Sequence, residues 1–161
     1  MPSPFDLPPR PELFGPEHQA FRATLAAFVA REITPFAAEW DEAGAFPRAL
    51  YAKAAAIGLL GLGFPEHLGG TPGDVGFTLV AAEELARAGS GGVQAGLGSH
   101  QIGLPPIVAL GSAELQQRVV PPVLAGEKIA ALAITEPGGG SDVAALATTA
   151  VRDGDHYVVR G

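Results

Sequence analysis

Apolar residues recur at intervals of three and four along most of the first 127 positions, which is the spacing of amphipathic helices. The first helix is predicted to begin at Pro16, where a missing N–H costs nothing, and its apolar stripe consists of Phe21, Leu25, Phe28 and Val29. Pro35 should end or kink it, because proline cannot donate a helical hydrogen bond, and a short helix should follow to about Ala43. Residues 1–15 are proline-rich and are predicted to form an extended arm.

Two more helices are predicted on either side of a loop rich in glycine and proline. The earlier one runs from Pro47 to Gly58, and the loop spans residues 64–73. Asp74 can cap the later helix through its side-chain oxygen, and Gly89 should end it. The residues expected to face inward are Leu50, Ala54 and Ile57 on the earlier helix, and Val75, Leu79, Ala82 and Leu85 on the later one.

The last part of the helical region is interrupted by prolines. Residues 91–110 are weakly helical, with an interruption at Pro105-Pro106. Ser112 is predicted to cap one more helix, which should break near Pro121-Pro122 and end by Gly126, since proline cannot continue the hydrogen-bond ladder.

The pattern changes after this region. Residues 129–134 form a short apolar run that is predicted to be a strand, and residues 147–152 and 157–160 are typical of a β-hairpin around Asp153-Gly154. The expected fold class is therefore mainly α: an amino-terminal helical, up-and-down bundle-like domain over residues 16–127, followed by the beginning of a β domain over residues 128–161. A two-stranded ribbon is marginal by itself, so we expect this β domain to be incomplete.

Composition and charge exclude several classes of protein. The 161 residues contain no cysteine and carry a formal net charge of -7, which excludes disulfides and thiolate metal sites. The basic residues form no positive stripe, so nucleic acid is not an expected partner. No apolar run is long enough to span a membrane, and the start of the chain lacks the pattern of a signal peptide. We therefore expect a cytoplasmic protein that does not associate with membranes.

Single histidines and carboxylates suggest no active site. His18, His67, His100 and His156 lack metal-ligand spacing, so no metal site is predicted and these residues are expected at the surface or in loops. Consecutive residues on a helix diverge, so Glu83-Glu84 is not expected to form a paired-carboxylate site. Ser99 lacks the flanking glycines of a hydrolase elbow.

The most informative segment is Ile134-Thr-Glu-Pro-Gly-Gly-Gly-Ser-Asp142. Three consecutive glycines let a backbone approach a ligand and turn its N–H groups toward one point. Thr135 and Ser141 add hydroxyl donors, and Asp142 can cap a following turn. Such a loop suits a diphosphate or the pyrimidine end of a flavin, although a plain glycine-rich connection has the same composition. The spacings of a dinucleotide fingerprint and of a P-loop are both absent.

This segment resembles the first signature of the acyl-CoA dehydrogenase family. Other stretches match the family in order: Leu124-Ala-Gly-Glu-Lys128, Phe64-Pro-Glu-His-Leu-Gly-Gly70, Glu83-Glu-Leu-Ala86, Gly111-Ser-Ala-Glu-Leu-Gln-Gln117 and Asp155-His-Tyr-Val-Val-Arg-Gly161. The resemblance implies a helical domain, a middle β domain of barrel type and a carboxy-terminal helical bundle, with FAD between the last two. Gly139 stands where the family often has alanine, which is a mild departure.

The resemblance also implies a cofactor site. Leu132, Ile134 and Thr135 would line the flavin, with Thr135 donating near its N1 and C2 carbonyl. Gly140 and Ser141 would approach the FAD diphosphate, and Ser141 would also contact the acyl-CoA substrate. No catalytic residue is assigned within this chain, because the family's catalytic base is a carboxylate in the bundle, expected beyond Gly161.

The implied activity is α,β-dehydrogenation of acyl-CoA thioesters in fatty acid metabolism, with electrons passed to an electron-transferring flavoprotein and a homo-tetramer or homo-dimer as the full-length assembly. The chain alone is expected to be inactive. Two alternatives remain: an acyl-CoA oxidase or flavin monooxygenase of the same fold, or a non-catalytic helical interaction domain. The length and branching of the acyl chain are not readable from these residues.

Overall fold

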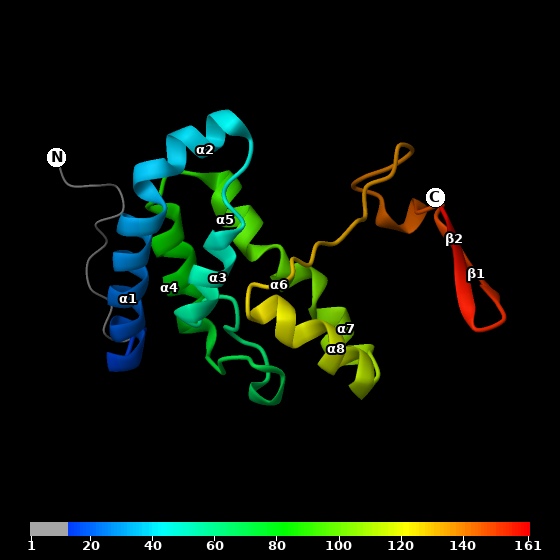
Figure 1. The fold of residues 1–161 in the computed structure, drawn as a ribbon, viewed down its shortest axis with the longest axis horizontal. Helices are drawn as coiled ribbons and strands as arrows, with labels where there is room; N and C mark the ends of the chain where they lie inside the picture. Colours follow the sequence, from blue (N-terminus) through cyan, green and yellow to red (C-terminus); the bar gives the residue numbers. More distant parts are fainter. Residues whose placement is uncertain (1–12) are drawn as a thin grey trace. The chain divides into compact units, whose positions relative to one another are not determined.

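The structure, a computed structural model, describes residues 13–161, so most of the arm predicted over residues 1–15 lies outside the described residues. Contacts divide the chain into a helical unit that ends at Ala131 and a carboxy-terminal unit from Leu132 to Gly161, and each is described by itself (Figure 1). The α-helices are α1 (Pro16–Glu32), α2 (Ala37–Ala43), α3 (Ala49–Ala56), α4 (Val75–Ala86), α5 (Gly91–Gly98), α6 (His100–Gly103), α7 (Pro105–Leu110) and α8 (Ala113–Leu124). The 3-10 turns span Thr34–Phe36, Glu66–Leu68 and Val143–Ala145, and the strands are β1 (Thr149–Asp153) and β2 (His156–Arg160).

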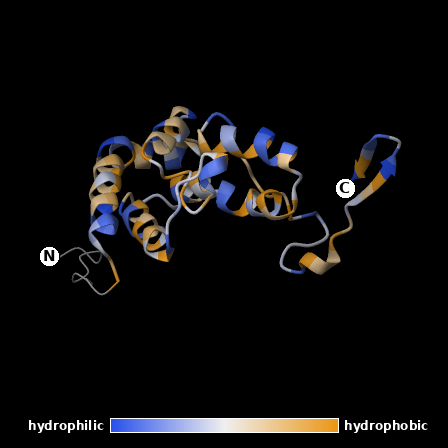
Figure 2. Ribbon diagram, turned by 90° about the horizontal axis from the view of Figure 1, so that it is seen from below, coloured by the Kyte–Doolittle hydropathy of each residue, from blue (hydrophilic) through white to orange (hydrophobic). Residues whose placement is uncertain are grey.

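The beginning of the helical unit follows the apolar pattern. Pro16 occupies the first turn of α1, and Leu25, Phe28 and Val29 are buried while Phe21 packs partly buried beside them. A 3-10 turn at Pro35 separates α1 from α2. The predicted stripe and the predicted break are therefore confirmed. Figure 2 shows hydrophobic and hydrophilic residues interspersed along the helices of this unit.

The predicted inward face of α4 is wrong in three of its four residues. Asp74 caps the helix as expected, accepting a hydrogen bond from the amide of Gly76. However, Val75, Leu79 and Ala82 are exposed, whereas the buried face consists of Gly76, Val80, Ala81, Glu84 and Leu85. Helix α4 lies beside α1 (Figure 1), and an ion pair from Arg22 of α1 holds Glu84 on the buried side. An ion pair between two helices thus helps to determine which face of α4 is buried, whereas the hydrophobic pattern alone predicted a different face.

The break predicted at Pro121-Pro122 is also wrong, because α8 continues through both prolines. The Pro121 carbonyl accepts from the amide of Ala125, and the Pro122 carbonyl accepts from that of Glu127, so the last turn keeps its bonds. The prolines sit between buried side chains that pack in a second core cluster of Phe64, Leu68, Leu104, Val120, Val123 and Leu124. This burial compensates for the two missing N–H donors. The caps predicted at Ser112 and the end at Gly126, which has a φ of 75°, are confirmed.

The carboxy-terminal unit contains the predicted hairpin but not the predicted preceding strand. Strands β1 and β2 pair antiparallel, with Val151 opposite Val158, and Gly154 forms the turn with a φ of 60°. Residues 129–134 carry no strand. A strand needs a partner to satisfy its backbone groups, and in the part of the chain that the structure describes, β1 and β2 pair only with each other.

The mainly helical fold class with a carboxy-terminal hairpin is confirmed. The domain limits at residues 16, 127 and 128 stay predictions. No helix among residues 13–161 is long and apolar enough to cross a membrane, and no group of three metal-ligating side chains occurs among them.

Candidate functional site

The glycine-rich segment forms a narrow loop in the carboxy-terminal unit. Glu136 and Gly139 exchange two backbone hydrogen bonds, with N···O distances of 3.0 and 3.1 Å. The turn between them is made by Pro137 and Gly138, where proline and glycine fit a reversal of the chain. This pairing places Gly140 beside Thr135, because a Cβ at Gly140 would lie 3.9 Å from the Thr135 methyl group.

The polar groups of this loop are available to a ligand. Thr135, Gly140 and Ser141 are exposed, and among residues 13–161 no hydrogen-bond partner is found for either hydroxyl or for the amides of Gly140 and Ser141. A Cβ at Gly138 would meet nothing within 4 Å. Hydroxyls and bare amides that face open space can bind an anionic or carbonyl oxygen without first breaking bonds inside the protein.

Two other predicted residues lie at the start of the same unit. Ile134 is half-buried and, with Gly140, lines a small recess of the loop. Leu132 is 46% exposed. The structure thus brings Ile134, Thr135 and Gly140 together, and Ser141 directly follows them. The predicted cap by Asp142 is absent, since its side chain accepts no bond from the turn Val143–Ala145.

A carboxylate that the sequence analysis did not single out closes this loop. The two side-chain oxygens of Glu136 accept hydrogen bonds from the amides of Ala147 and Thr148, both at 2.8 Å. The Thr148 side chain and these two amides lower the pKa of Glu136, because each donor stabilises the charged form. The only available signal was the position of Glu136 inside the motif.

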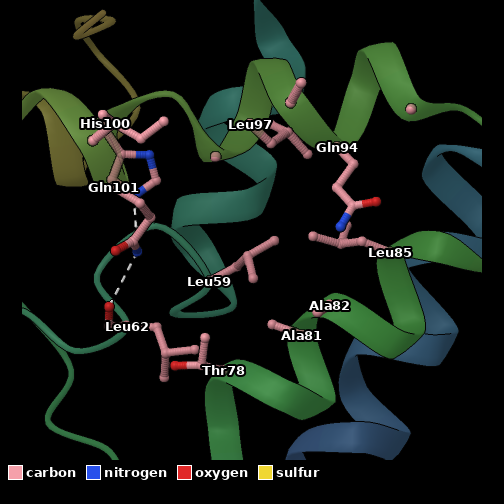
Figure 3. A pocket seen from close by; sticks show the side chains of 14 residues that line it. Leu59, Leu62, Thr78, Ala81, Ala82, Leu85, Gln94, Leu97, His100 and Gln101 are labelled. Atoms are coloured by element: carbon pink, nitrogen blue, oxygen red, sulfur yellow. Dashed lines mark hydrogen bonds between the residues drawn. The ribbon is translucent and has the colours of Figure 1, made fainter. Parts of the chain in front are cut away.

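The helical unit contains an apolar pocket of about 550 Å³ that sequence reasoning missed. Figure 3 shows side chains from α4, α5 and α6 surrounding it, among them Thr78, Ala82, Gln94 and Leu97. Ile102 of α6 also lines the pocket. The sequence signal for this pocket was the presence of apolar residues on more than one side of α4. One side packs on α1, and Ala82 on another side lines the pocket.

His100 and Gln101 supply polar groups in the pocket wall. The Nε2 of His100 donates to the carbonyl of Leu60 at 2.7 Å. The Gln101 amide donates to the carbonyl of Leu62 at 3.2 Å (Figure 3). Burial lowers the pKa of His100, so the ring is neutral near pH 7. The pocket is therefore uncharged and suits an apolar ligand.

The expectation of surface histidines is wrong for His18 and His100, which are 6% and 4% exposed. The Nδ1 of His18 accepts from the amide of Gly15, so its Nε2 donates to Asp74, at 2.8 Å. These bonds join the beginnings of α1 and α4, a structural role that no spacing rule indicates.

Glu83 and Glu84 both pair with Arg22, at 2.6 and 2.8 Å. The guanidinium joins the two side chains, and Arg87 also pairs with Glu84, at 3.2 Å. Both carboxylates therefore take part in ion pairs that join α1 to α4.

Comparison with known proteins identifies the unit that carries the pocket. Residues 15–127 match the family described as acyl-CoA dehydrogenase, N-terminal domain. The chain belongs to the acyl-CoA dehydrogenase family. It is 38% identical over 149 residues to the mitochondrial long-chain specific acyl-CoA dehydrogenase of Sus scrofa, a match that covers 92% of this chain and 34% of that protein. The chain thus spans about a third of the curated relative's length.

Solved structures of the family show the same fold. A probable acyl-CoA dehydrogenase from Mycobacterium abscessus is 49% identical, with a TM-score of 0.88 over 92% of this chain and 40% of that one. An acyl-CoA dehydrogenase from Bacillus anthracis complexed with FAD is 35% identical, with a TM-score of 0.81 over 100% of this chain and 28% of that one. A chain in the ChsE4–ChsE5 complex from Mycobacterium tuberculosis is 34% identical, with a TM-score of 0.71 over 92% and 38%. Relatives of this chain are therefore found with FAD and in protein complexes.

The loop from Thr135 to Ser141 fits the flavin that the family implies. A flavin with its diphosphate offers carbonyl and phosphoryl oxygens, and this loop offers hydroxyl and amide donors with no partner among residues 13–161. The open space around Gly138 leaves room for a close approach. No rearrangement of the described hydrogen bonds is needed to free these donors.

Proposed function

We propose that this chain is the amino-terminal part of an FAD-dependent acyl-CoA dehydrogenase that removes two hydrogens across the α,β bond of acyl-CoA thioesters. The observation that carries the proposal is the unpaired donor set of Thr135, Gly140 and Ser141 in a chain of this family. When bound, FAD would supply the acceptor for the hydride that leaves the β-carbon. The base that takes the α-proton is proposed to be a carboxylate beyond Gly161.

Each proposed residue has a binding role. The Thr135 hydroxyl donates to the flavin near N1 and the C2 carbonyl, where donors stabilise the negative charge that develops on reduction. The amide of Gly140 and the hydroxyl of Ser141 hold the diphosphate, and Ser141 also contacts the acyl-CoA. Leu132 and Ile134 cover the ring system and exclude water from it.

The apolar pocket of the helical unit is proposed to receive an apolar part of the substrate. Its volume of about 550 Å³ and its uncharged wall suit a hydrocarbon chain, which is stabilised by leaving water. Ala82→Leu would fill part of this pocket. We expect that variant of the full-length enzyme to have a higher KM for the longest accepted acyl-CoA than the wild type, with little change for the shortest. Ala38→Leu, on the exposed side of α2, is the matched control.

Three further properties are proposed for the full-length protein, the first two from family membership and the third from the composition and the start of the chain. The electron acceptor is an electron-transferring flavoprotein, the full-length assembly is a homo-tetramer or homo-dimer, and the location is cytoplasmic. The chain of 161 residues alone is proposed to be inactive, because the bundle that supplies the base is needed for both halves of the reaction.

The deciding experiment mixes purified full-length enzyme with acyl-CoAs of increasing length under anaerobic conditions. We expect the visible flavin absorbance to bleach and the α,β-unsaturated product to form. Rapid reoxidation of the reduced enzyme in air would instead identify an oxidase or a monooxygenase of the same fold. A full-length protein that carries no flavin and binds none would refute the enzymatic proposal and leave the helical interaction domain.

A further inference from the structure

Glu136 closes the loop that carries the flavin-binding donors. Its backbone is paired with Gly139, and its two carboxylate oxygens accept from the amides of Ala147 and Thr148, at 2.8 Å each. Because β1 begins at Thr149, one side chain connects the loop directly to the entrance of the hairpin. Residues 137–146, which include Gly140 and Ser141, are thereby enclosed between the Glu136 backbone and the amides that its carboxylate binds.

The two hydrogen bonds that the Glu136 carboxylate accepts also offset its negative charge. A carboxylate near the proposed position of an anionic diphosphate would repel it if its oxygens were free. Here both oxygens accept N–H bonds, so the charge of Glu136 is offset by two amide dipoles. Hydrogen bonds to an ionised acceptor are the stronger class, which suits a half-buried residue that must hold a loop with little hydrophobic core.

We propose that Glu136 is a positioning residue that fixes the donors of Thr135, Gly140 and Ser141 at the spacing FAD requires. The inference rests on the proposed function, because it assumes that this loop binds FAD. Glu136 itself is not proposed to contact a reacting atom. Its effect is exerted through the Glu136–Gly139 pair on one side and the hairpin entrance on the other.

The test compares full-length wild type with Glu136→Gln, Glu136→Asp and Ala147→Pro, using FAD itself as the probe. Glutamine presents an NH₂ donor where a carboxylate oxygen accepted, so one N–H loses its partner. Proline at 147 removes one N–H donor and leaves Glu136 intact. The ψ of 125° at Leu146 is already the extended value that a residue before proline adopts.

Glu136→Gln and Ala147→Pro should weaken FAD binding to the apoenzyme by roughly 10- to 100-fold, which corresponds to losing one hydrogen bond to a charged group. Glu136→Asp retains the charge and should recover part of the affinity. At saturating FAD, the visible spectrum of the bound flavin should shift in the two weakened variants, because the donors at the ring have moved. The melting temperature of the apoenzymes should stay at the wild-type value, which a merely structural role would not predict. Asp155→Asn, an exposed carboxylate in the same unit, is the control and should change none of these.

Wild-type affinity and spectrum in both Glu136→Gln and Ala147→Pro would overturn the inference while leaving the proposed function in place. A lower melting temperature with an unchanged spectrum would also overturn it, because Glu136 would then stabilise the fold only. If wild-type full-length protein binds no FAD, the proposed function itself fails. Should Glu136→Gln not fold, the comparison of Ala147→Pro with wild type decides the question.

Discussion

The helical unit and the carboxy-terminal unit are stabilised by different means. The helical unit buries two apolar clusters that include Leu25, Leu60 and Leu104, each 1% exposed or less. In the carboxy-terminal unit all ten residues of β1 and β2 are exposed, and the Glu136 carboxylate supplies a local closure. The proposed cofactor donors lie in the second unit. Residues that bind a ligand need polar groups without partners inside the protein. In a packed core such groups would form hydrogen bonds with other protein groups.

The largest expected loss of stability comes from a substitution in the apolar core of the helical unit. Leu104→Ala should lower the free energy of unfolding by about 4 kcal/mol, because it removes buried methyl groups and leaves a cavity. Val159→Ala in β2, where the side chain is 65% exposed, should change it by less than about 0.5 kcal/mol. Urea denaturation of the two variants beside wild type measures both values. Equal losses would mean that the hairpin is as well packed as the helices, contrary to the comparison.

A smaller loss is expected when the buried ion pair between α1 and α4 is broken. Arg22→Ala leaves Glu84, which is 3% exposed, without its α1 partner. Breaking a buried pair in this way costs roughly 3 kcal/mol, at the low end of its range because Arg87 still contacts Glu84. The control is Arg31→Ala, which removes an exposed pair with Glu32 and should have little effect. Chemical unfolding followed by circular dichroism measures the loss of unfolding free energy in Arg22→Ala and in Arg31→Ala.

This ion pair also explains what the sequence could not predict. The helix start at Pro16, the caps at Asp74 and Ser112 and the turn at Gly154 were predictable, because each depends on the residue's own chemistry and its nearest neighbours. The buried face of α4 was not, since it depends on Arg22, which is 62 positions away from Glu84.

The same distinction holds for the candidate site. The motif predicted which loop carries unpaired donors, because three glycines and two hydroxyls are local features. It did not predict the apolar pocket, whose wall is assembled from α4, α5 and α6, or the Glu136 closure, which joins positions 11 and 12 apart. The strand expected at 129–134 failed for a related reason, because pairing requires a partner that local sequence does not specify.

A third prediction compares a cap that forms with one that does not. The Ser112 hydroxyl accepts from the amide of Leu115 at the start of α8, so Ser112→Ala should cost about 1 kcal/mol of unfolding free energy. Asp142 precedes a turn in the carboxy-terminal unit but accepts no such bond, and Asp142→Ala should leave the unfolding curve unchanged. Thermal melting of both variants checks this pair. A loss at Asp142 would show that the cap predicted from the sequence does form in solution.

The smallest expected effect is on the pH dependence of the unfolding free energy. It compares Asp74 of the helical unit with Glu136 of the carboxy-terminal unit. The hydrogen bond from His18, followed by that from the Gly76 amide, lowers the pKa of Asp74 below its usual 3.8. A lowered pKa in the folded state means that the stability contributed by Asp74 is complete above this usual value. That stability is lost as the pH falls through the lowered pKa. Unfolding free energies measured at a series of pH values should therefore fall less steeply on acidification in Asp74→Asn than in wild type. Glu136→Gln should follow the wild-type curve, because the Glu136 bonds hold a loop outside the cooperative helical core. A flattened curve in Glu136→Gln, with a wild-type curve in Asp74→Asn, would reverse the roles assigned to the two units.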